Sequence, residues 1–438
     1  MLHIWGDLLT SDTLQFGFKA GVSTTQCSWL VMEVAQHFLR KDTPIIATLL
    51  DCSKAFDKCL FNKLFTKLLE KGLPPIVVRV LIYVYEEQEG CVKLAGVYST
   101  GFRLTNGTRQ GSVLSPIIFS VYLDGLIQEL RQQGLGCHCS GVWMGCLGYA
   151  DDLILLAPSR GTMAKMLDVC ERYALNHNLE FSTDPVPAKS KSKCLYMCGK
   201  KANVTYPAPL YLKGTTLPWV KTATHLGHEL HQHCNMEHDV KVKRAQFINN
   251  SVEVRDIFSF AEPGEILRAV RVYAGHHYGS MLWDLDGEMC GQYCRSWSTC
   301  VKLTHNVPRS THTYLVDHVL ASGFLPIKTE LMARYGNFYN SLSNSKSSEV
   351  RFMASVVVRD IRSTTAKNLA TIRRESGLNS LTVPSSAVRQ HVPLTEVPVN
   401  QDWRMGLLVK LLRQRREAEN SLIDTTIIST IIDSLCSS

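Results

Sequence analysis

The sequence lacks an apolar run long enough to cross a membrane. A spanning helix needs about 18 or more nearly uninterrupted apolar residues, and the most apolar helical stretch, residues 75–85, contains Arg79. The first ten residues have no basic start and are interrupted by Asp7, so no secretory signal peptide is indicated. These absences predict an intracellular protein, in the nucleus and cytoplasm, with no membrane partner.

Regularly paired cysteines are also missing. The 15 cysteines are an odd number spread irregularly over 438 residues, unlike the framework of a small disulfide-rich domain, so we expect reduced thiols. Two groups of histidine and cysteine lack the CxxC spacing of common zinc modules, and zinc stays open as the less favoured interpretation of both. Their members are His225, His228, His231, His233, Cys234 and His238, and Cys290, Cys294, Cys300 and His305.

Charge and composition are those of an ordinary folded protein. Lys and Arg number 47 against 39 Asp and Glu, a net charge of +8, which suits a nucleic-acid partner but is shared by many unrelated proteins. Hydrophobic residues make up 45% of the chain, enough for a large core. At roughly 100–200 residues per domain, the length predicts two or three packed units.

The pattern of apolar residues predicts an α+β fold. Continuous apolar runs indicate strands at residues 45–50, 143–147, 153–157 and 194–197. Helical spacing predicts helices from residue 58 to the stop at Gly72, through residues 77–84, from Ser115 as N-cap to Gly134, and through residues 163–174. This order is typical of an antiparallel sheet backed by helices.

Three acidic residues stand at the ends of predicted buried strands. Asp51 follows the first strand, and Asp151 with Asp152 forms the tip of the predicted hairpin. Two carboxylates about 4 Å apart repel by roughly 4 kcal/mol at an effective dielectric near 20, so a cation is expected between them. Carboxylate oxygens suit Mg²⁺ or Mn²⁺, and two such ions catalyse nucleotidyl transfer. A solvated Asp-Asp turn is the alternative.

Four motifs around these acids resemble those of reverse transcriptases. Tyr149, Ala150, Asp151 and Asp152 match the YADD box, and residues 50–57 (LDCSKAFD) resemble the first catalytic box. Residues 108–116 (TRQGSVLSP) resemble the template and nucleotide box, and residues 16–19 (FGFK) with Gly21 and residues 23–25 resemble a fingers motif of LINE-type (non-LTR) retrotransposon polymerases. Weaker likeness continues at residues 223–228 and 307–312.

The resemblance implies a right-hand polymerase fold. Residues 1–215 would form partial fingers and a palm with an antiparallel sheet, residues 216–330 a helical thumb, and residues 331–438 a helical C-terminal segment. It also implies RNA-directed DNA polymerase activity on an RNA template, a DNA primer, target DNA and deoxynucleoside triphosphates.

The resemblance assigns roles to individual residues. Asp51 and Asp151 would hold two Mg²⁺ or Mn²⁺ ions, and Asp152 would support them with added negative charge. Lys191 would protonate or neutralise pyrophosphate, although a Lys-rich surface turn explains Lys189, Lys191 and Lys193 nearly as well.

The substrate-binding residues implied in the same way are Phe56, Arg109, Gln110, Gly111 and Tyr149. Phe56 would exclude a 2′-hydroxyl by its bulk, with core packing as the alternative. Gln110 and Gly111 would line the nucleotide pocket beside Arg109, and Tyr149 would pack beneath the ions and the primer end.

Basic residues between Lys241 and Arg271 are expected to grip the template–primer backbone; a solvated helix face explains them equally well.

The motifs begin a dozen residues after Met1, and neither the preceding fingers segments nor an endonuclease is visible. We therefore expect an N-terminally truncated reverse transcriptase, with a catalytically inactive remnant that only binds nucleic acid as the alternative. Another palm enzyme, an RNA-templated RNA polymerase or a nucleotide cyclase, is disfavoured by the fingers and template boxes.

Overall fold

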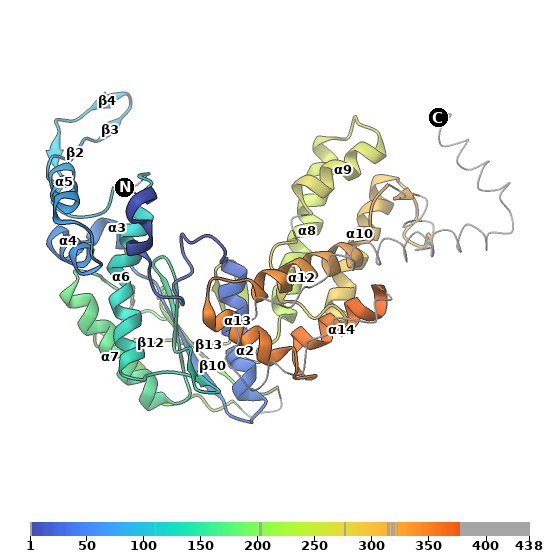
Figure 1. Ribbon diagram of the computed structural model, residues 1–438. Coiled ribbons are helices and arrows are strands. Elements are labelled where there is room, and N and C mark those ends of the chain that lie inside the picture. The colour runs from blue at the N-terminus through green and yellow to red at the C-terminus, as the bar shows by residue number, and fades with distance from the viewer. Residues whose placement is uncertain are drawn as a thin grey trace. The chain divides into compact units, whose positions relative to one another are not determined.

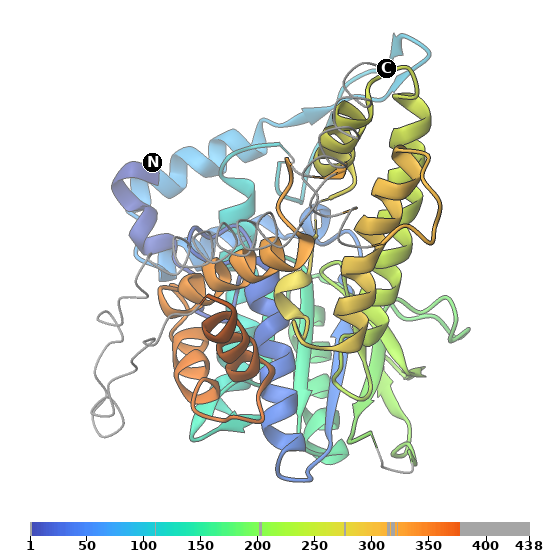
Figure 2. The same cartoon turned by 90° about the vertical axis from the view of Figure 1, so that its right-hand side faces the viewer.

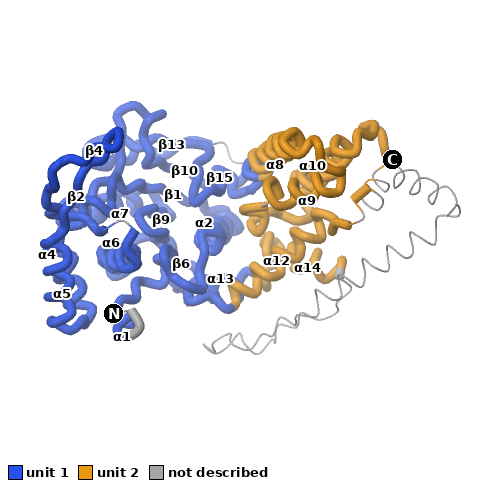
Figure 3. The backbone as a smooth tube through the Cα atoms, turned by 90° about the horizontal axis from the view of Figure 1, so that it is seen from above, with its two compact units in different colours: residues 1–239, 344–357 blue, residues 240–343, 358–438 orange. Residues whose placement is uncertain are grey.

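The computed structural model describes residues 2–109, 111–200, 204–275, 277–312, 316, 320, 321 and 323–376. The backbone forms two compact units, which Figure 3 shows in separate colours. Unit 1 comprises residues 1–239 and 344–357, and unit 2 comprises residues 240–343 and 358–438. All residues of the predicted active site belong to unit 1, and each unit is described by itself.

Unit 1 is built on a five-stranded sheet in the order β13-β10-β1-β9-β8. Its strands are β1 (Ile45–Leu50), β8 (Cys146–Tyr149), β9 (Asp152–Ala157), β10 (Lys193–Met197) and β13 (Trp219–Val220). All neighbours are antiparallel except β10 and β13. The central strand β1 is buried along nearly its whole length, which explains why its apolar run is continuous.

Helices cover both faces of this sheet. The helix α2 (Thr24–Leu39) packs on β1 and β8, while α6 (Ser115–Gln132) and α7 (Arg160–Asn176) pack on β8 and β9 and on each other. Figure 1 shows the sheet between α2 and the α6–α7 pair, and Figure 2 shows α2, in blue, running along the strands. The predicted antiparallel sheet backed by helices is confirmed.

Two helix starts differ from the prediction. The helix expected from residue 58 is split into α3 (Ala55–Lys58) and α4 (Phe61–Glu70), because the extended Leu60 pairs with Asn106 in a β-bridge. The next helix, α5 (Pro75–Glu86), begins two residues earlier than predicted, with Pro75 in its first turn, where a missing N–H costs nothing.

Shorter elements complete unit 1. They are α1 (Leu2–Trp5), η1 (Gly6–Leu9), β2 (Glu89–Gly90), β3 (Lys93–Leu94), β4 (Val97–Tyr98), β5 (Phe102–Arg103), β6 (His138–Cys139), β7 (Val142–Trp143), β11 (Leu210–Leu212), β12 (Thr215–Leu217), β14 (Thr222–His225) and β15 (His228–His231). The strand predicted at residues 143–147 begins only at Cys146. At Gly145 the backbone passes so close to Leu135 that a Cβ would lie 2.6 Å from its carbonyl oxygen.

Unit 2 is helical in its described residues. Its elements are α8 (Glu237–Ile257), which begins at the end of unit 1, α9 (Pro263–Tyr273), η2 (Ser280–Leu282), α10 (Glu288–Thr304), α12 (Ile327–Ser343) and α14 (Thr364–Ser376). The fully buried Trp283 packs against Tyr293. The side chain of Asn368 donates to the carbonyl oxygen of Trp283 at 2.8 Å. The predicted C-terminal segment is helical as far as residue 376, and residues 377–438 lie outside the described residues.

The chain returns to unit 1 at α13 (Ser348–Val357), which packs on α2. In the serine-rich segment before it, Ser345 and Ser347 are buried, each 1% exposed. The hydroxyl of Ser345 donates to Gln26 at 2.9 Å. The proposed limits at residues 215 and 330 stay predictions. The two compact units divide after residue 239.

No helix in the described ranges is both long and apolar enough to cross a membrane.

Candidate active site

Strand register brings the three predicted aspartates to one edge of the sheet in unit 1. Leu50 pairs with Leu153, so Asp51 lies beside Asp152 where the two strands end. Asp151 occupies the turn of the β8–β9 hairpin, which is closed by the pair Tyr149 and Asp152. The end of β1 and the hairpin tip therefore meet at this edge of the sheet.

Lost solvent and like charge raise the pKa values of two of these carboxyls. Partial burial is the main cause that raises the pKa of Asp151 above 3.8, and repulsion from Asp51 is a smaller one. Asp152 lies nearer the surface, yet loss of part of its solvent and repulsion from Asp151 and Asp51 raise its pKa as well. Groups that repel in this way are stabilised by a bound cation.

A lysine stands beside Asp51, on the loop that leads into β10. The ammonium nitrogen of Lys191 lies 3.7 Å from Oδ2 of Asp51, and its side chain is 69% exposed. The next residue, Ser192, accepts a hydrogen bond from the backbone N–H of Asp51 at 3.2 Å. Of the three candidate lysines, Lys193 is paired within the sheet and Lys189 is exposed, so Lys191 is the one placed beside the acids.

The ring of Phe56 is held from one side and partly exposed. It stacks on the fully buried Phe119, with ring centroids 4.2 Å apart and planes at 25°, and meets the edge of Phe18 at 6.3 Å. The packing interpretation and the gate interpretation are compatible here, because a half-buried ring stacked on a buried neighbour can still present a fixed surface.

The loop of the nucleotide box lies beside Phe56. The backbone N–H of Thr108 donates to the carbonyl oxygen of Phe56 at 2.6 Å. Arg109 is exposed, and Gly111 has a φ of +82° with open space around its Cα. Gln110 lies outside the described residues.

The predicted N-cap at Ser115 is wrong. The helix α6 begins at Ser115 itself, preceded by Leu114 as a cap residue without a side-chain hydrogen bond. The hydroxyl of Ser115 donates instead to the carbonyl oxygen of Arg109, which is a contact within the nucleotide box that fixes the loop to the helix.

Residues 8–230 match the family described as reverse transcriptase (RNA-dependent DNA polymerase), a match of more than half of the chain. The chain belongs to this family.

Relatives of this chain are polymerases of mobile elements, in keeping with the LINE-type motifs. The Pol polyprotein of type-1 retrotransposable element R2 from Nasonia vitripennis is 25% identical over 193 residues, 44% of this chain and 18% of that protein. The probable RNA-directed DNA polymerase from transposon BS of Drosophila melanogaster is 28% identical over 225 residues, 49% of this chain and 23% of that protein. The chain spans about a fifth of the length of these relatives.

Among solved structures, the reverse transcriptase chain has a low likeness to telomerases. Apo telomerase from Candida tropicalis gives a TM-score of 0.37 at 12% identity, covering 79% of this chain and 54% of that one. Telomerase from Candida albicans in complex with a fragment of telomeric RNA gives 0.33 at 11% identity, covering 74% and 53%.

The acidic edge fits the divalent metal ions on which reverse transcriptases in general depend. It offers hard carboxylate oxygens whose mutual repulsion a cation would relieve. Within the described ranges, no three His, Cys, Asp or Glu side chains form a metal-binding group by themselves. Mg²⁺ does not require one, because it usually takes one or two protein carboxylates and completes its shell with water and substrate phosphates.

In the part of the chain that the structure describes, the histidine- and cysteine-rich groups do not bring three or more such side chains together. His225 is instead a buried core residue whose Nδ1 lies 3.1 Å from the hydroxyl of Ser28. Burial, with a smaller effect of His228, lowers the pKa of His225 to about 3, so the ring is neutral at physiological pH.

One residue at the acidic edge was not predicted. Gln15 is fully buried and hydrogen-bonds both the N–H and the carbonyl oxygen of Ala150, the residue before Asp151. Its position directly before the fingers motif at residues 16–19 was the available signal. The contact itself joins residues 135 positions apart, which no local pattern reveals.

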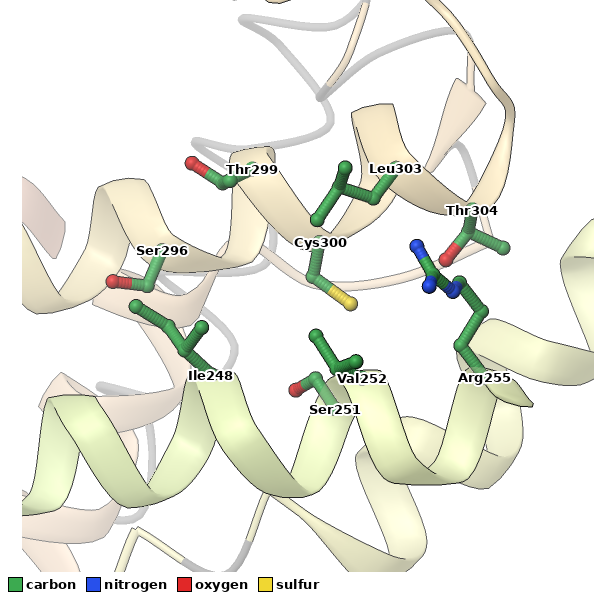
Figure 4. A pocket seen from close by; sticks show the side chains of 9 residues that line it. All are labelled: Ile248, Ser251, Val252, Arg255, Ser296, Thr299, Cys300, Leu303 and Thr304. Carbon is green, nitrogen blue, oxygen red and sulfur yellow. The ribbon is translucent and has the colours of Figure 1, made fainter. Parts of the chain in front are cut away.

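A separate small pocket lies in unit 2, between α8 and α10. Figure 4 shows its lining, which is mostly apolar side chains and hydroxyls with Arg255 at one end. None of the predicted site residues lines it.

Proposed function

We propose that this chain is the RNA-directed DNA polymerase of a non-LTR retrotransposon. The observation that supports it best is the placement of Asp51, Asp151 and Asp152 at one sheet edge inside the segment that matches the reverse transcriptase family. The reaction joins the 3′-oxygen of a DNA primer to the α-phosphorus of a deoxynucleoside triphosphate. The bond from that phosphorus to the pyrophosphate oxygen breaks, and the hydroxyl proton leaves.

Asp51 and Asp151 would hold two Mg²⁺ or Mn²⁺ ions, and Asp152 would add negative charge beside them. When bound, two such ions activate the attacking hydroxyl and stabilise the departing pyrophosphate. The carboxylates come from a central strand and from the hairpin paired with it, so their separation is fixed by backbone hydrogen bonds. That rigidity favours in-line attack.

Lys191 would act on the leaving group. Its ammonium group is 3.7 Å from Asp51 and its long, exposed side chain is free to reach a phosphate beside the acids. It would neutralise the pyrophosphate or give it a proton as the bond to the α-phosphorus breaks.

The remaining predicted residues would shape the nucleotide pocket. Phe56, stacked on Phe119, would exclude the 2′-hydroxyl of a ribonucleotide. Gly111 would allow close approach of the triphosphate, next to Arg109 and Gln110. Tyr149 would lie under the primer end, because it is the cross-strand neighbour of Asp152.

The partners proposed are an RNA template, a DNA primer and target DNA, and deoxynucleoside triphosphates. Synthesis at target DNA would place the chain in the nucleus after its translation in the cytoplasm.

A primer-extension assay tests this proposal. We expect the chain to extend a DNA primer on an RNA template in the presence of Mg²⁺ or Mn²⁺ and deoxynucleoside triphosphates, and Asp151→Asn to abolish extension. Asp168→Asn, an exposed aspartate on α7, is the matched control and should extend normally.

Two outcomes contradict the proposal. Binding of the template–primer without extension at any metal concentration would identify a catalytically inactive remnant. Extension with ribonucleotides in preference to deoxyribonucleotides would identify a different palm polymerase.

A further inference from the structure

We infer that Gln15 is a positioning residue of the polymerase site, which holds the turn that carries Asp151 and Asp152. This inference rests on the proposed function. The turn has an unusual backbone conformation. Ala150 has a φ of +57°, in the left-handed region that residues with a Cβ rarely occupy. Such a conformation persists only where the surroundings fix it.

The carboxamide of Gln15 supplies that fixation. Its Oε1 accepts from the N–H of Ala150 at 2.9 Å, and its Nε2 donates to the carbonyl oxygen of Ala150 at 3.1 Å. One side chain therefore satisfies both backbone groups of the residue directly before Asp151. The same Oε1 also accepts from the N–H of Gly17 at 3.0 Å, which fixes the rotamer of Gln15.

Two glycines leave the room that this contact needs. A Cβ on Gly17 would lie 2.3 Å from the nitrogen of Ala150, and a Cβ on Gly148 would lie 3.0 Å from Nε2 of Gln15. Contacts at such distances force neighbouring atoms to move. The backbone of the fingers motif and that of the catalytic hairpin are thus packed face to face.

The segment that carries Gln15 is itself fastened at both ends. The backbone N–H of Phe16 donates to the carbonyl oxygen of Gly148 at 2.7 Å, and the N–H of Gly148 donates to that of Leu14 at 2.9 Å. Gln15 and Gly148 thus form an isolated parallel β-bridge. Upstream, the N–H of Asp12 donates to Asp124 on α6 at 2.5 Å. The segment that carries Gln15 is therefore hydrogen-bonded to α6 as well as to the hairpin.

Gln15 is 0% exposed and cannot touch substrate. Its effect on catalysis would pass through the backbone at Ala150 to the carboxylates that follow. A displacement of these groups by about 1 Å is enough to cost roughly 100-fold in rate.

Hydrogen–deuterium exchange of the metal-free chain tests the contact without relying on activity. We expect Gln15→Met, which keeps the length of the side chain but makes no such hydrogen bonds, to speed exchange in the peptide containing Ala150. Gln26→Met is the matched control, because Gln26 is also buried but lies on α2 and accepts from Ser345. Exchange at Ala150 equal to that of the unmodified chain would overturn the inference.

Kinetics test the positioning role. Gln15→Met should lower kcat of primer extension by about 10- to 100-fold with little change in KM for template–primer, while Gln26→Met should not. A loss confined to KM, or one no larger than that of Gln26→Met, would contradict the inference. Absence of extension by the unmodified chain would refute the proposed function and leave the exchange result to decide on Gln15.

Gln15→Glu provides a conservative rescue. A protonated carboxyl offers one donor and one acceptor in place of the amide, whereas its ionised form has no donor and adds charge near Asp151 and Asp152. The kcat of Gln15→Glu relative to the unmodified chain should rise as pH falls, because protonation of the new carboxyl restores a hydrogen-bond donor and removes its charge. A ratio that does not change with pH would contradict the role of the Nε2 donor.

Discussion

Asp151 and Asp152 occupy positions where their charges oppose folding. Partial loss of solvent and mutual repulsion raise their pKa values above 3.8, so the folded chain binds protons more tightly there than the unfolded chain does. Stability from these groups is therefore lost as pH rises through the raised pKa values. Residues that weaken the fold at neutral pH are typical of a site maintained for function.

Asp151→Asn should stabilise the metal-free chain while it abolishes synthesis. The amide removes a repelled charge, so the thermal midpoint of unfolding at pH 8 should rise, by a few degrees at most, and the gain should shrink as the pH falls toward 3.8. Scanning calorimetry measures this directly, with Asp168→Asn as control. A lower midpoint at pH 8 would mean that Asp151 has a stabilising partner.

Phe56→Val should admit ribonucleotides. Loss of the ring opens space where the 2′-hydroxyl would lie, and we expect the ratio of ribonucleotide to deoxyribonucleotide incorporation to rise about 10-fold or more. Phe119→Leu should give a smaller rise because it only loosens the stacked ring. Phe65→Leu, a buried change on α4, is the control. If the ratio of ribonucleotide to deoxyribonucleotide incorporation is unchanged in Phe56→Val, Phe56 serves only in packing.

Lys191→Met should slow incorporation about 100-fold without changing the affinity for template–primer. The reason is its place beside Asp51, where it would meet the pyrophosphate. Lys189→Met removes an exposed lysine from the same loop, and equal losses in both variants would favour general surface charge over a specific role. Single-turnover incorporation by the two variants measures these losses.

At the scale of elements, a charged network fastens the fingers motif to helices far away in sequence. Arg131 on α6 binds Asp12 at 2.6 Å and Glu349 on α13 at 3.1 Å, and the hydroxyl of Thr13 donates to Glu349 at 2.9 Å. Burial by itself raises the pKa of Glu349, but these hydrogen bonds and the charge of Arg131 hold it below 4.5. The helix α13 therefore supports the segment that carries Gln15.

Glu349→Ala should destabilise unit 1 by about 1–3 kcal/mol, because it removes the buried carboxylate that accepts from part-buried donors on Thr13 and Arg131. The depressed pKa means that this stability is present above 4.5 and is lost as the pH falls below it. Urea unfolding at pH 7 and pH 4 measures both effects. Glu70→Ala, an exposed change on α4, is the control, and equal costs in the two variants would contradict the network.

The basic residues of α8 and α9 divide into two groups. Arg271 packs over Trp297 at 4.1 Å and pairs with Glu330, Arg244 binds Ser296 and Arg255 binds Asp256. These three have contacts inside unit 2. Lys241 and Arg268 are exposed and are the better candidates for phosphate contacts.

Lys241→Ala and Arg268→Ala should each weaken template–primer binding and reduce the salt dependence of the affinity by about one unit of slope. Fluorescence anisotropy over a range of salt concentrations gives both quantities. Arg271→Ala should instead lower the stability of unit 2, since its pairing with Glu330 and its contact with Trp297 are lost. A solvated helix face predicts unchanged slopes in the first two variants.

How much the sequence predicts depends on the range of the contact. The continuous run of β1, the hairpin around Asp151 and the position of Lys191 follow from local patterns. The split before α4, the hydroxyl contact of Ser115 and the buried serines near residue 345 depend on partners distant in sequence. Gln15 belongs to the second kind, because its burial exists only once the hairpin lies against the fingers motif.

At the scale of the whole molecule, the family match occupies residues 8–230, almost all of unit 1 before α8. Unit 2 is an all-helical body in its described residues, and its role as a thumb stays a prediction. The chain spans about a fifth of the length of its mobile-element relatives. Activity of this length of polypeptide is therefore the claim on which the functional account depends.

Primer extension by the unmodified chain and by Asp51→Asn tests that claim most directly. Asp51 and Asp151 are 100 positions apart in the sequence, and the pairing of β1 with β9 brings them to the same edge of the sheet. The account predicts Mg²⁺-dependent synthesis of DNA on an RNA template by the unmodified chain and by Asp168→Asn, and none by Asp51→Asn. Synthesis that persists in Asp51→Asn, or is missing from the unmodified chain while template–primer still binds, would contradict it.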